Sequence, residues 1–192
     1  MEQLSRTREI VVIGMFTALT CLVSLILKWG GDVLVPFSLL PMMALLAGAL
    51  LGSRAGAMSI AAYTVMGLIG IPVFAKPPYG GPMYVVQPTF GFLLGFIAAA
   101  FVVGRILERH ETPGFLRYLL SMTAGITVYY AVGLPYLWLI VNFYLGKAIT
   151  AMGAIKIGFL PFIGLDLVKA GLASVVAHMV AQRVKIATRK PA

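Results

Sequence analysis

Six long apolar stretches alternate with short polar segments or segments rich in Pro and Gly along this chain. A helix needs roughly 20 apolar residues to cross a hydrocarbon core about 30 Å thick. The pattern therefore predicts an all-α integral membrane protein, in which residues 1–192 form a single domain that is a bundle of six transmembrane helices. The expected spans are 9–28, 36–52, 55–72, 88–107, 117–143 and 158–181.

The composition agrees with this class, because 60% of the residues are hydrophobic, 11% are charged and the mean hydropathy is +0.98. Six spans leave no room for a soluble catalytic or nucleotide-binding domain. The net charge of +9 is assigned to membrane-flanking loops, because no basic patch with interleaved aromatic residues points to nucleic acid. Arg6 and Arg8 precede the first span as in a signal peptide, but its length and the lack of a small-residue cleavage site predict a retained helix.

Basic residues are distributed unevenly between the two sides of this six-span arrangement. Ten fall on one side and four on the other, with Lys169 left inside the last span. Cytoplasmic loops carry the excess of Lys and Arg, so both termini are expected in the cytoplasm. The ten are Arg6, Arg8, Arg54, Arg105, Arg109, Arg117, Arg183, Lys185, Arg189 and Lys190, and the four are Lys28, Lys76, Lys147 and Lys156.

The segments expected outside the cell are longer and more elaborate than the cytoplasmic turn "LLGSRAGA". They read "KWGGDVLVPF", "PVFAKPPYGGPMYVVQP" and "YLGKAITAMGAIKIG". Five prolines in residues 72–88, the 72–88 loop, prevent a continuous helix there. We interpret this loop as a lid folded over a pocket, because irregular backbone near membrane depth is tolerated where it lines a cavity. A plain external loop with tight turns at Gly80–Gly81 is the alternative.

Two charges, Asp166 and Lys169, interrupt the last apolar stretch, "FLPFIGLDLVKAGLASVVAHMV". They are three residues apart and therefore lie on one face of a helix. Ionisable residues at membrane depth are costly and usually face a cavity or the bundle interior, so this pair is a hypothesis for a functional site. Two alternatives stay open: an ion pair that only fixes helix packing, and a Lys169 side chain that extends toward the interface.

Further polar side chains are expected around the same outward-facing cavity. They are Lys76, Tyr79 and Gln87 from the 72–88 loop, and Tyr129 or Tyr130 from the fifth span. The two tyrosines are adjacent, and we do not expect both to face the cavity. Tyr130 is taken as the ligand-binding candidate, but the sequence leaves open which of the two faces the cavity. Such residue types suit a small polar ligand with an apolar ring.

No catalytic or metal-binding pattern accompanies these residues. His110 and His178 are expected at the cytoplasmic side, far from the outer polar group, and the single Cys21 is expected to be a packing residue. No phosphate-binding loop of the Walker type occurs, so ATP-driven work would need another chain. Small residues recur in "LLAGALLG" and "GAMSIAA", where internal helix packing is expected, and at Gly14 and Ala18, where an outside partner is an equal alternative.

Three segments together resemble the BioY family, the biotin-specific S subunits of energy-coupling-factor (ECF) vitamin transporters. They are "VPFSLLPMMALLAGALLGSRAGAMSIAAYTVMGLIGIPVFA", "GGPMYVVQPTFGFLLGF" and "PFIGLDLVKAGLA". The resemblance implies a non-enzymatic, multi-pass subunit in the cell membrane of a prokaryote that captures biotin from outside. It also implies docking on a transmembrane coupling protein of the EcfT type that carries two ATP-binding-cassette ATPases. No cofactor is implied, since biotin would be the transported ligand.

Carried over to this chain, the resemblance places ligand binding at Asp166 and Lys169 and partner docking at Gly14 and Ala18. The ureido N–H groups of biotin would donate to Asp166, and Lys169 would donate to the ureido oxygen or the carboxylate tail. The remaining candidate ligand-binding residues are Lys76 for the tail, Phe74, Tyr79 and Tyr84 over the rings, and Gln87, Tyr130 and Ser38.

The chain departs from the family pattern at three positions of this region. Leu40 stands where Gln is common, Lys76 where Asn or Gly is usual, and Gln87 where Gly usually precedes "PT". The departures leave open a biotin precursor or another small vitamin as the ligand. A solitary facilitator and a small intramembrane enzyme are the alternatives from other classes.

Overall fold

The computed structural model describes residues 2–29, 38–110 and 113–183, and within these ranges it contains helices and no strand. Four segments are long and apolar enough to cross a membrane: Arg6–Ile26, Phe90–Glu108, Phe115–Tyr144 and Leu160–Arg183. The prediction of an all-helical membrane protein is therefore confirmed. The helices are α1 (Glu2–Trp29), α2 (Leu40–Leu51), α3 (Ser53–Leu68), α4 (Phe90–Glu108), α5 (Phe115–Leu139), α6 (Ala151–Gly158) and α7 (Leu160–Arg183). A 3-10 helix, η2 (Pro82–Val86), and a π-helical turn, η3 (Ile140–Tyr144), complete the set.

Each expected span overlaps a described helix, with ends that differ by several residues, and the span 117–143 covers most of α5 and part of η3. Six crossings stay a prediction, because four segments of the described residues have the length and hydropathy to span a membrane. Both α3 and α5 end four residues before the expected position. Helix α3 ends at Leu68 because Gly70 takes a positive φ of 106° and Pro72 follows. Helix α6 lies in a segment that we expected to be a loop, and the side chain of Thr150 caps it by accepting from the Gly153 N–H. The start of the second expected span, most of "KWGGDVLVPF" and the basic residues beyond 183 lie outside the described residues.

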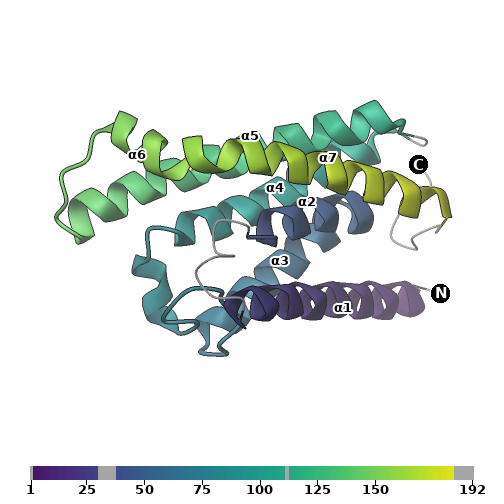
Figure 1. Cartoon of the computed structure of the whole chain (residues 1–192). Helices are drawn as coiled ribbons and strands as arrows, with labels where there is room; N and C mark the ends of the chain where they lie inside the picture. The colour runs from purple at the N-terminus through teal and green to yellow at the C-terminus, as the bar shows by residue number, and fades with distance from the viewer. Residues whose placement is uncertain (1, 30–37, 111–112, 184–192) are drawn as a thin grey trace.

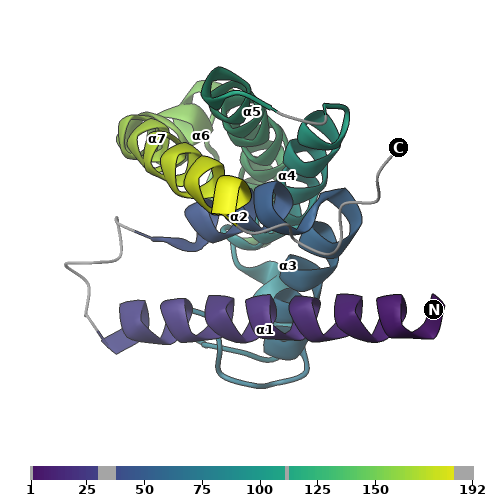
Figure 2. The same cartoon turned by 90° about the vertical axis from the view of Figure 1, so that its right-hand side faces the viewer.

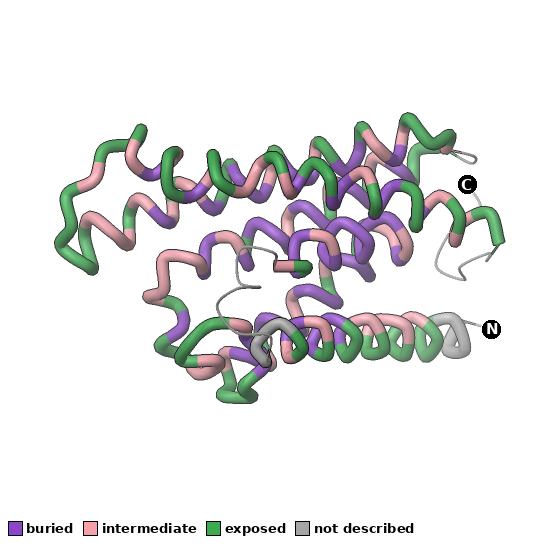
Figure 3. The backbone as a smooth tube through the Cα atoms, viewed as in Figure 1, coloured by how far each residue is buried: buried purple, intermediate pink, exposed green. Residues whose placement is uncertain are grey.

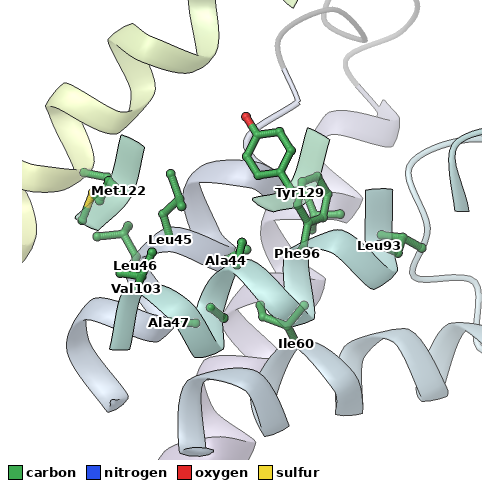
Figure 4. Close-up of a cluster of buried hydrophobic side chains, with 14 of the residues drawn as sticks. Ala44, Leu45, Leu46, Ala47, Ile60, Leu93, Phe96, Val103, Met122 and Tyr129 are labelled. Atoms are coloured by element: carbon green, nitrogen blue, oxygen red, sulfur yellow. The ribbon is translucent and has the colours of Figure 1, made fainter. Parts of the chain in front are cut away.

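The helices form layers that build outward from α1 (Figures 1 and 2). Helix α3 packs between α1 and the layer of α2 and α4, and α5 with α7 covers the other side of that layer. Helix α4 contacts α2, α3 and α5, so it forms the centre of the bundle. The buried side chains gather around it, as the labelled residues of Figure 4 illustrate.

Glycines let the central helices approach closely. A Cβ at Gly48 would lie 2.2 Å from the Ala100 carbonyl oxygen, and one at Gly56 would lie 2.6 Å from the Ala47 carbonyl oxygen. Small residues allow such contacts between membrane helices. The prediction of internal packing for "LLAGALLG" and "GAMSIAA" is therefore confirmed. Gly14 differs, because a Cβ there would meet nothing within 4 Å.

The outward faces of α1, α5 and α7 are exposed and apolar (Figure 3). Ile10 and Met15 of α1 are each 69% exposed, and Leu116 of α5 is 66% exposed. Continuous apolar faces of this extent are unusual on water-soluble monomers and suit contact with lipid tails or with other membrane proteins.

Candidate ligand-binding site

A cavity of about 290 Å³ lies between α2, α3, α4, α5, α6, α7 and the 72–88 loop. Its wall is mainly apolar, with aromatic side chains from α3, α4, α5, α7 and the 72–88 loop. A small number of polar groups in an apolar, largely preformed cavity is typical of small-molecule sites. The polar lining residues are Ser38, Tyr63, Lys76, Tyr84, Thr89, Tyr129, Tyr130, Asp166 and Lys169, and the phenylalanines are Phe74, Phe92, Phe96 and Phe162.

The charged pair of α7 is buried and lines this cavity. Asp166 is 4% exposed and Lys169 is 8% exposed. The Lys169 ammonium donates to Asp166 Oδ1 over 3.0 Å, as the spacing of three residues on one helix allows. Lys169 therefore does not extend toward an interface.

Both tyrosines of α5 bind the same carboxylate. The hydroxyls of Tyr129 and Tyr130 donate to Asp166 Oδ2 over 2.6 Å and 2.7 Å, and both residues line the cavity. The expectation that only one of them faces the cavity is wrong. Neighbouring positions on a helix are about 100° apart, so two long side chains can flank the contact line with α7 and converge on one group.

Aromatic rings hold the two tyrosines in place. Tyr129 meets Phe96 edge to face at a centroid distance of 5.1 Å, and Tyr130 meets Phe92 at 5.9 Å and Phe159 at 4.8 Å. Such pairs fix ring orientation. The Asp166 carboxylate therefore sits among oriented donors.

The hydrogen-bond count shows which groups are open to a ligand. The Asp166 carboxylate accepts three hydrogen bonds, out of about four acceptor positions on its two oxygens. The Lys169 ammonium has three N–H donors, and one of them goes to Asp166. The pair is thus more open as a donor through Lys169 than as an acceptor through Asp166.

The 72–88 loop closes one side of the cavity. Phe74 and Lys76 contribute to the lining, as does Tyr84 of η2, and the rings of Phe74 and Tyr84 are 4.1 Å apart. The Phe74 N–H donates to the Tyr79 carbonyl over 2.8 Å, so this part of the loop is an ordered turn. Burial raises the pKa of Tyr84, so its hydroxyl stays protonated and can act as a donor.

Phe74 occupies its place because residue 67 of α3 is a glycine. A Cβ at Gly67 would lie 2.1 Å from the Phe74 ring. The Gly81 N–H of the loop also donates to the Gly67 carbonyl over 2.7 Å. Gly67 therefore positions both the loop and an aromatic wall of the cavity.

Seven of the nine predicted ligand-binding residues line the cavity: Ser38, Phe74, Lys76, Tyr84, Tyr130, Asp166 and Lys169. Tyr79 and Gln87 are not part of the lining. Tyr79 forms a turn at a positive φ of 66°, and Gln87 lines a separate, more open hollow with Tyr144 and several prolines. The lining therefore differs from the expectation at these two positions, because a loop lacks the periodicity that tells where a side chain points. Ligand binding by Tyr79 and Gln87 stays a prediction.

The prediction missed most of the aromatic and apolar wall, including Tyr63, Phe92, Phe96, Ile157 and Phe162. In the sequence they are ordinary members of apolar stretches. The spacing of four residues between Phe92 and Phe96 places both on one face of α4, and this is the only signal we see for them.

Gly14, Ala18 and the histidines lie outside this site. Gly14 and Ala18 are exposed on α1. His110 contacts Arg117, and His178 lies next to Gln182. The described residues contain no cluster of potential metal ligands.

A helical membrane protein with a largely apolar cavity, a buried ion pair in the cavity wall and no catalytic cluster among the described residues has the features of a membrane-embedded small-molecule-binding protein. Residues 1–186 match the BioY family. The chain therefore belongs to the BioY family, and the resemblance noted from its motifs is confirmed.

Two relatives are described as biotin transporters. The "Probable biotin transporter BioY" of Lysinibacillus sphaericus is 38% identical over 172 residues, which are 90% of this chain and 86% of the relative. The "Biotin transporter BioY" of Thermotoga maritima is 38% identical over 170 residues, which are 88% of this chain and 94% of the relative. Both are named as transporters, which confirms the prediction that the chain is not an enzyme.

A solved structure supports the fold. It is described as the S-component for biotin from an ECF-type ABC transporter, determined at 2.1 Å. Its TM-score with this chain is 0.66 at 19% identity, and the match covers 94% of each chain. The two proteins share the S-component fold.

Proposed function

We propose that this chain is the biotin-binding S subunit of an ATP-driven ECF-type uptake transporter in the cell membrane of a prokaryote. The observation that carries the proposal is the buried Asp166–Lys169 pair, which lines a cavity of small-molecule size in a member of a family whose relatives are named biotin transporters. A pair that served packing alone would not need an open cavity beside it.

The chemistry of biotin fits the lining. The two N–H groups of Lys169 that bind no described residue donate to the ureido oxygen or to the carboxylate tail, and the remaining acceptor position of Asp166 receives one ureido N–H. Phe74 and Tyr84 cover the fused rings. Lys76 is exposed at the edge of the cavity and is the second candidate for the tail.

Six membrane crossings and two cytoplasmic termini are the proposed topology. The first turn of α1 and the last turn of α7 lie at the same end of the bundle (Figure 1), as an even number of crossings requires. Helix α2 has 12 residues and is only about 18 Å long, but ten of its residues are buried. Protein rather than lipid surrounds it, so a helix shorter than the hydrocarbon core is tolerated at this place in the bundle.

The coupling partners are a transmembrane protein of the EcfT type and two ATP-binding-cassette ATPases. The chain has no Walker-type loop, so uphill uptake needs ATPases supplied by other chains. The exposed strip of α1 around Gly14 and Ala18 supports docking there, because a Cβ at Gly14 would meet nothing within 4 Å of this chain.

Calorimetric titration of the purified full chain with biotin tests the proposal. We expect saturable binding of one biotin per chain, which falls strongly in Asp166→Asn and Lys169→Ala. Lys156→Ala is the matched control, because Lys156 is an exposed lysine outside the cavity lining. Absence of biotin binding would contradict the proposal. Saturable binding of another small vitamin or of a biotin precursor instead would keep the S-subunit class but replace the ligand.

A further inference from the structure

The hydroxyl of Tyr63 connects three parts of the molecule. Tyr63 belongs to α3, and its hydroxyl lies 3.0 Å from Ser24 Oγ of α1 and 3.2 Å from the Val73 carbonyl oxygen of the 72–88 loop. Since the single hydroxyl hydrogen of Tyr63 goes to the carbonyl, Ser24 is the donor to Tyr63. Ser24 and Tyr63 are each 1% exposed and Val73 is 4% exposed, so water does not compete for these bonds.

One end of this chain of hydrogen bonds touches the cavity wall. Val73 directly precedes Phe74, a lining residue. The rings of Tyr63 and Phe74 meet edge to face at 5.7 Å, and Tyr63 itself lines the cavity. A ligand that contacts Phe74 therefore restricts the residue that follows Val73, and the Val73 carbonyl is the group that Tyr63 binds.

The other end reaches α1, which packs on α3 and, less extensively, on α2. A second polar contact joins α1 to α3: the Thr17 hydroxyl lies 2.8 Å from the Ile13 carbonyl oxygen of its own helix and 3.0 Å from the Ser59 carbonyl oxygen of α3, and shares its hydrogen between them. That contact does not include the 72–88 loop. Ser24 is thus the polar contact of α1 that is also connected, through the Tyr63 hydroxyl, to the 72–88 loop.

From this geometry we infer that Tyr63 is a positioning residue that transmits occupancy of the cavity to α1. A ligand that holds Phe74 fixes the Val73 carbonyl, and the fixed carbonyl orients the Tyr63 hydroxyl toward Ser24. Helix α1 is then held more firmly against α3 when the ligand is bound than when the cavity is empty. Because coupling between two sites is reciprocal, firmer packing of α1 on α3 also strengthens ligand binding. The inference rests on the proposed function, because it takes biotin as the ligand.

Cys21 provides a native reporter of how firmly α1 packs on its neighbours. It is the only cysteine of the chain, it lies one turn before Ser24, and it is 8% exposed within the core cluster that includes Tyr63. Alkylation of its thiol by a maleimide requires α1 to move away from its neighbours. The experiment measures the rate of Cys21 alkylation in the purified full chain with and without saturating biotin.

We expect biotin to slow the alkylation of the unaltered chain several-fold. Tyr63→Phe removes the relay hydroxyl, so the ratio of the two rates should fall to about one when the variant is compared at a biotin concentration that calorimetry shows to saturate it. Ser24→Ala removes the α1 end of the relay without touching the cavity and should abolish the ratio as well. Thr17→Val is the matched control: it weakens the packing of α1 on α3 and speeds alkylation, but it keeps the effect of biotin.

Two results overturn the inference: a bound biotin that leaves the rate unchanged in the unaltered chain, or a full effect of biotin that persists in both Tyr63→Phe and Ser24→Ala. Calorimetry on the same samples separates this outcome from failure of the proposed function. If biotin does not bind the unaltered chain, both proposals fall; if it binds and the rates do not respond, only the relay does.

Discussion

Asp166→Asn is the change whose effect follows most directly from the contacts. The substitution removes the counterion of Lys169, which is buried and 3.0 Å from the carboxylate. Removal of one partner of a buried ion pair typically costs about 3–5 kcal/mol of stability. The Asn carbonyl can still accept the hydroxyls of Tyr129 and Tyr130, so we expect the lower end, about 3 kcal/mol.

The double variant Asp166→Asn with Lys169→Met separates packing from binding. Removal of both charges leaves no unpaired charge in the bundle, and such replacements are often neutral. We expect the double variant to recover most of the stability that the single variant loses. Biotin binding should not recover, because the donor and the acceptor are both gone. The loss of a charged partner in a desolvated site costs about 2–5 kcal/mol, or roughly 30-fold to several-thousand-fold in affinity.

Thermal unfolding in detergent without ligand measures the first effect, and calorimetric titration with biotin measures the second. By the scaling of globular domains of this size, about 3 kcal/mol lowers the midpoint by about 6–12 °C. Equal midpoints for the unaltered chain and Asp166→Asn would refute the account of a buried, mutually dependent pair. A double variant that binds biotin normally would show that the pair serves packing alone.

Three further predictions test the rest of the site. With biotin bound, the 72–88 loop should exchange its amide hydrogens more slowly than in the empty protein, and equal exchange would argue against a lid. Gly67→Ala should push the Phe74 ring into the cavity, since a Cβ would lie 2.1 Å from it, and should weaken biotin binding at least tenfold in titrations. Gly14→Leu or Ala18→Leu should leave binding intact but reduce ATP-dependent uptake by the reconstituted complex; loss of both activities together would indicate internal packing instead.

The long apolar helices and the buried charged pair could both be predicted from the sequence, for a shared reason. Apolar stretches of membrane length have few alternatives to helices, because every backbone N–H and C=O must be satisfied internally in lipid. Asp166 and Lys169 stood out for the same reason, since charges are rare in such stretches. Helix α6 was not predicted because its eight residues are too few to show a clear helical periodicity of apolar positions, and they include Lys156 and two glycines.

Contacts between elements account for what the sequence did not reveal. Nothing in the fifth span indicates that Tyr129 and Tyr130 both reach Asp166, because this depends on the register of α5 against α7. Phe92 lines the cavity through the position of α4 rather than through its residue type. Gln87 is the opposite case. Its polarity suggested a place in the site, but the fold of the 72–88 loop directs its side chain toward a separate hollow.

Native mass spectrometry of the full chain, gently purified and supplied with biotin, tests the central claim most directly. The account predicts one bound biotin per chain, its loss in Lys169→Met, and its retention in Lys156→Ala, where an exposed lysine outside the cavity is removed. A chain that carries no biotin, or a Lys169→Met variant that carries as much as the unaltered protein, would contradict it.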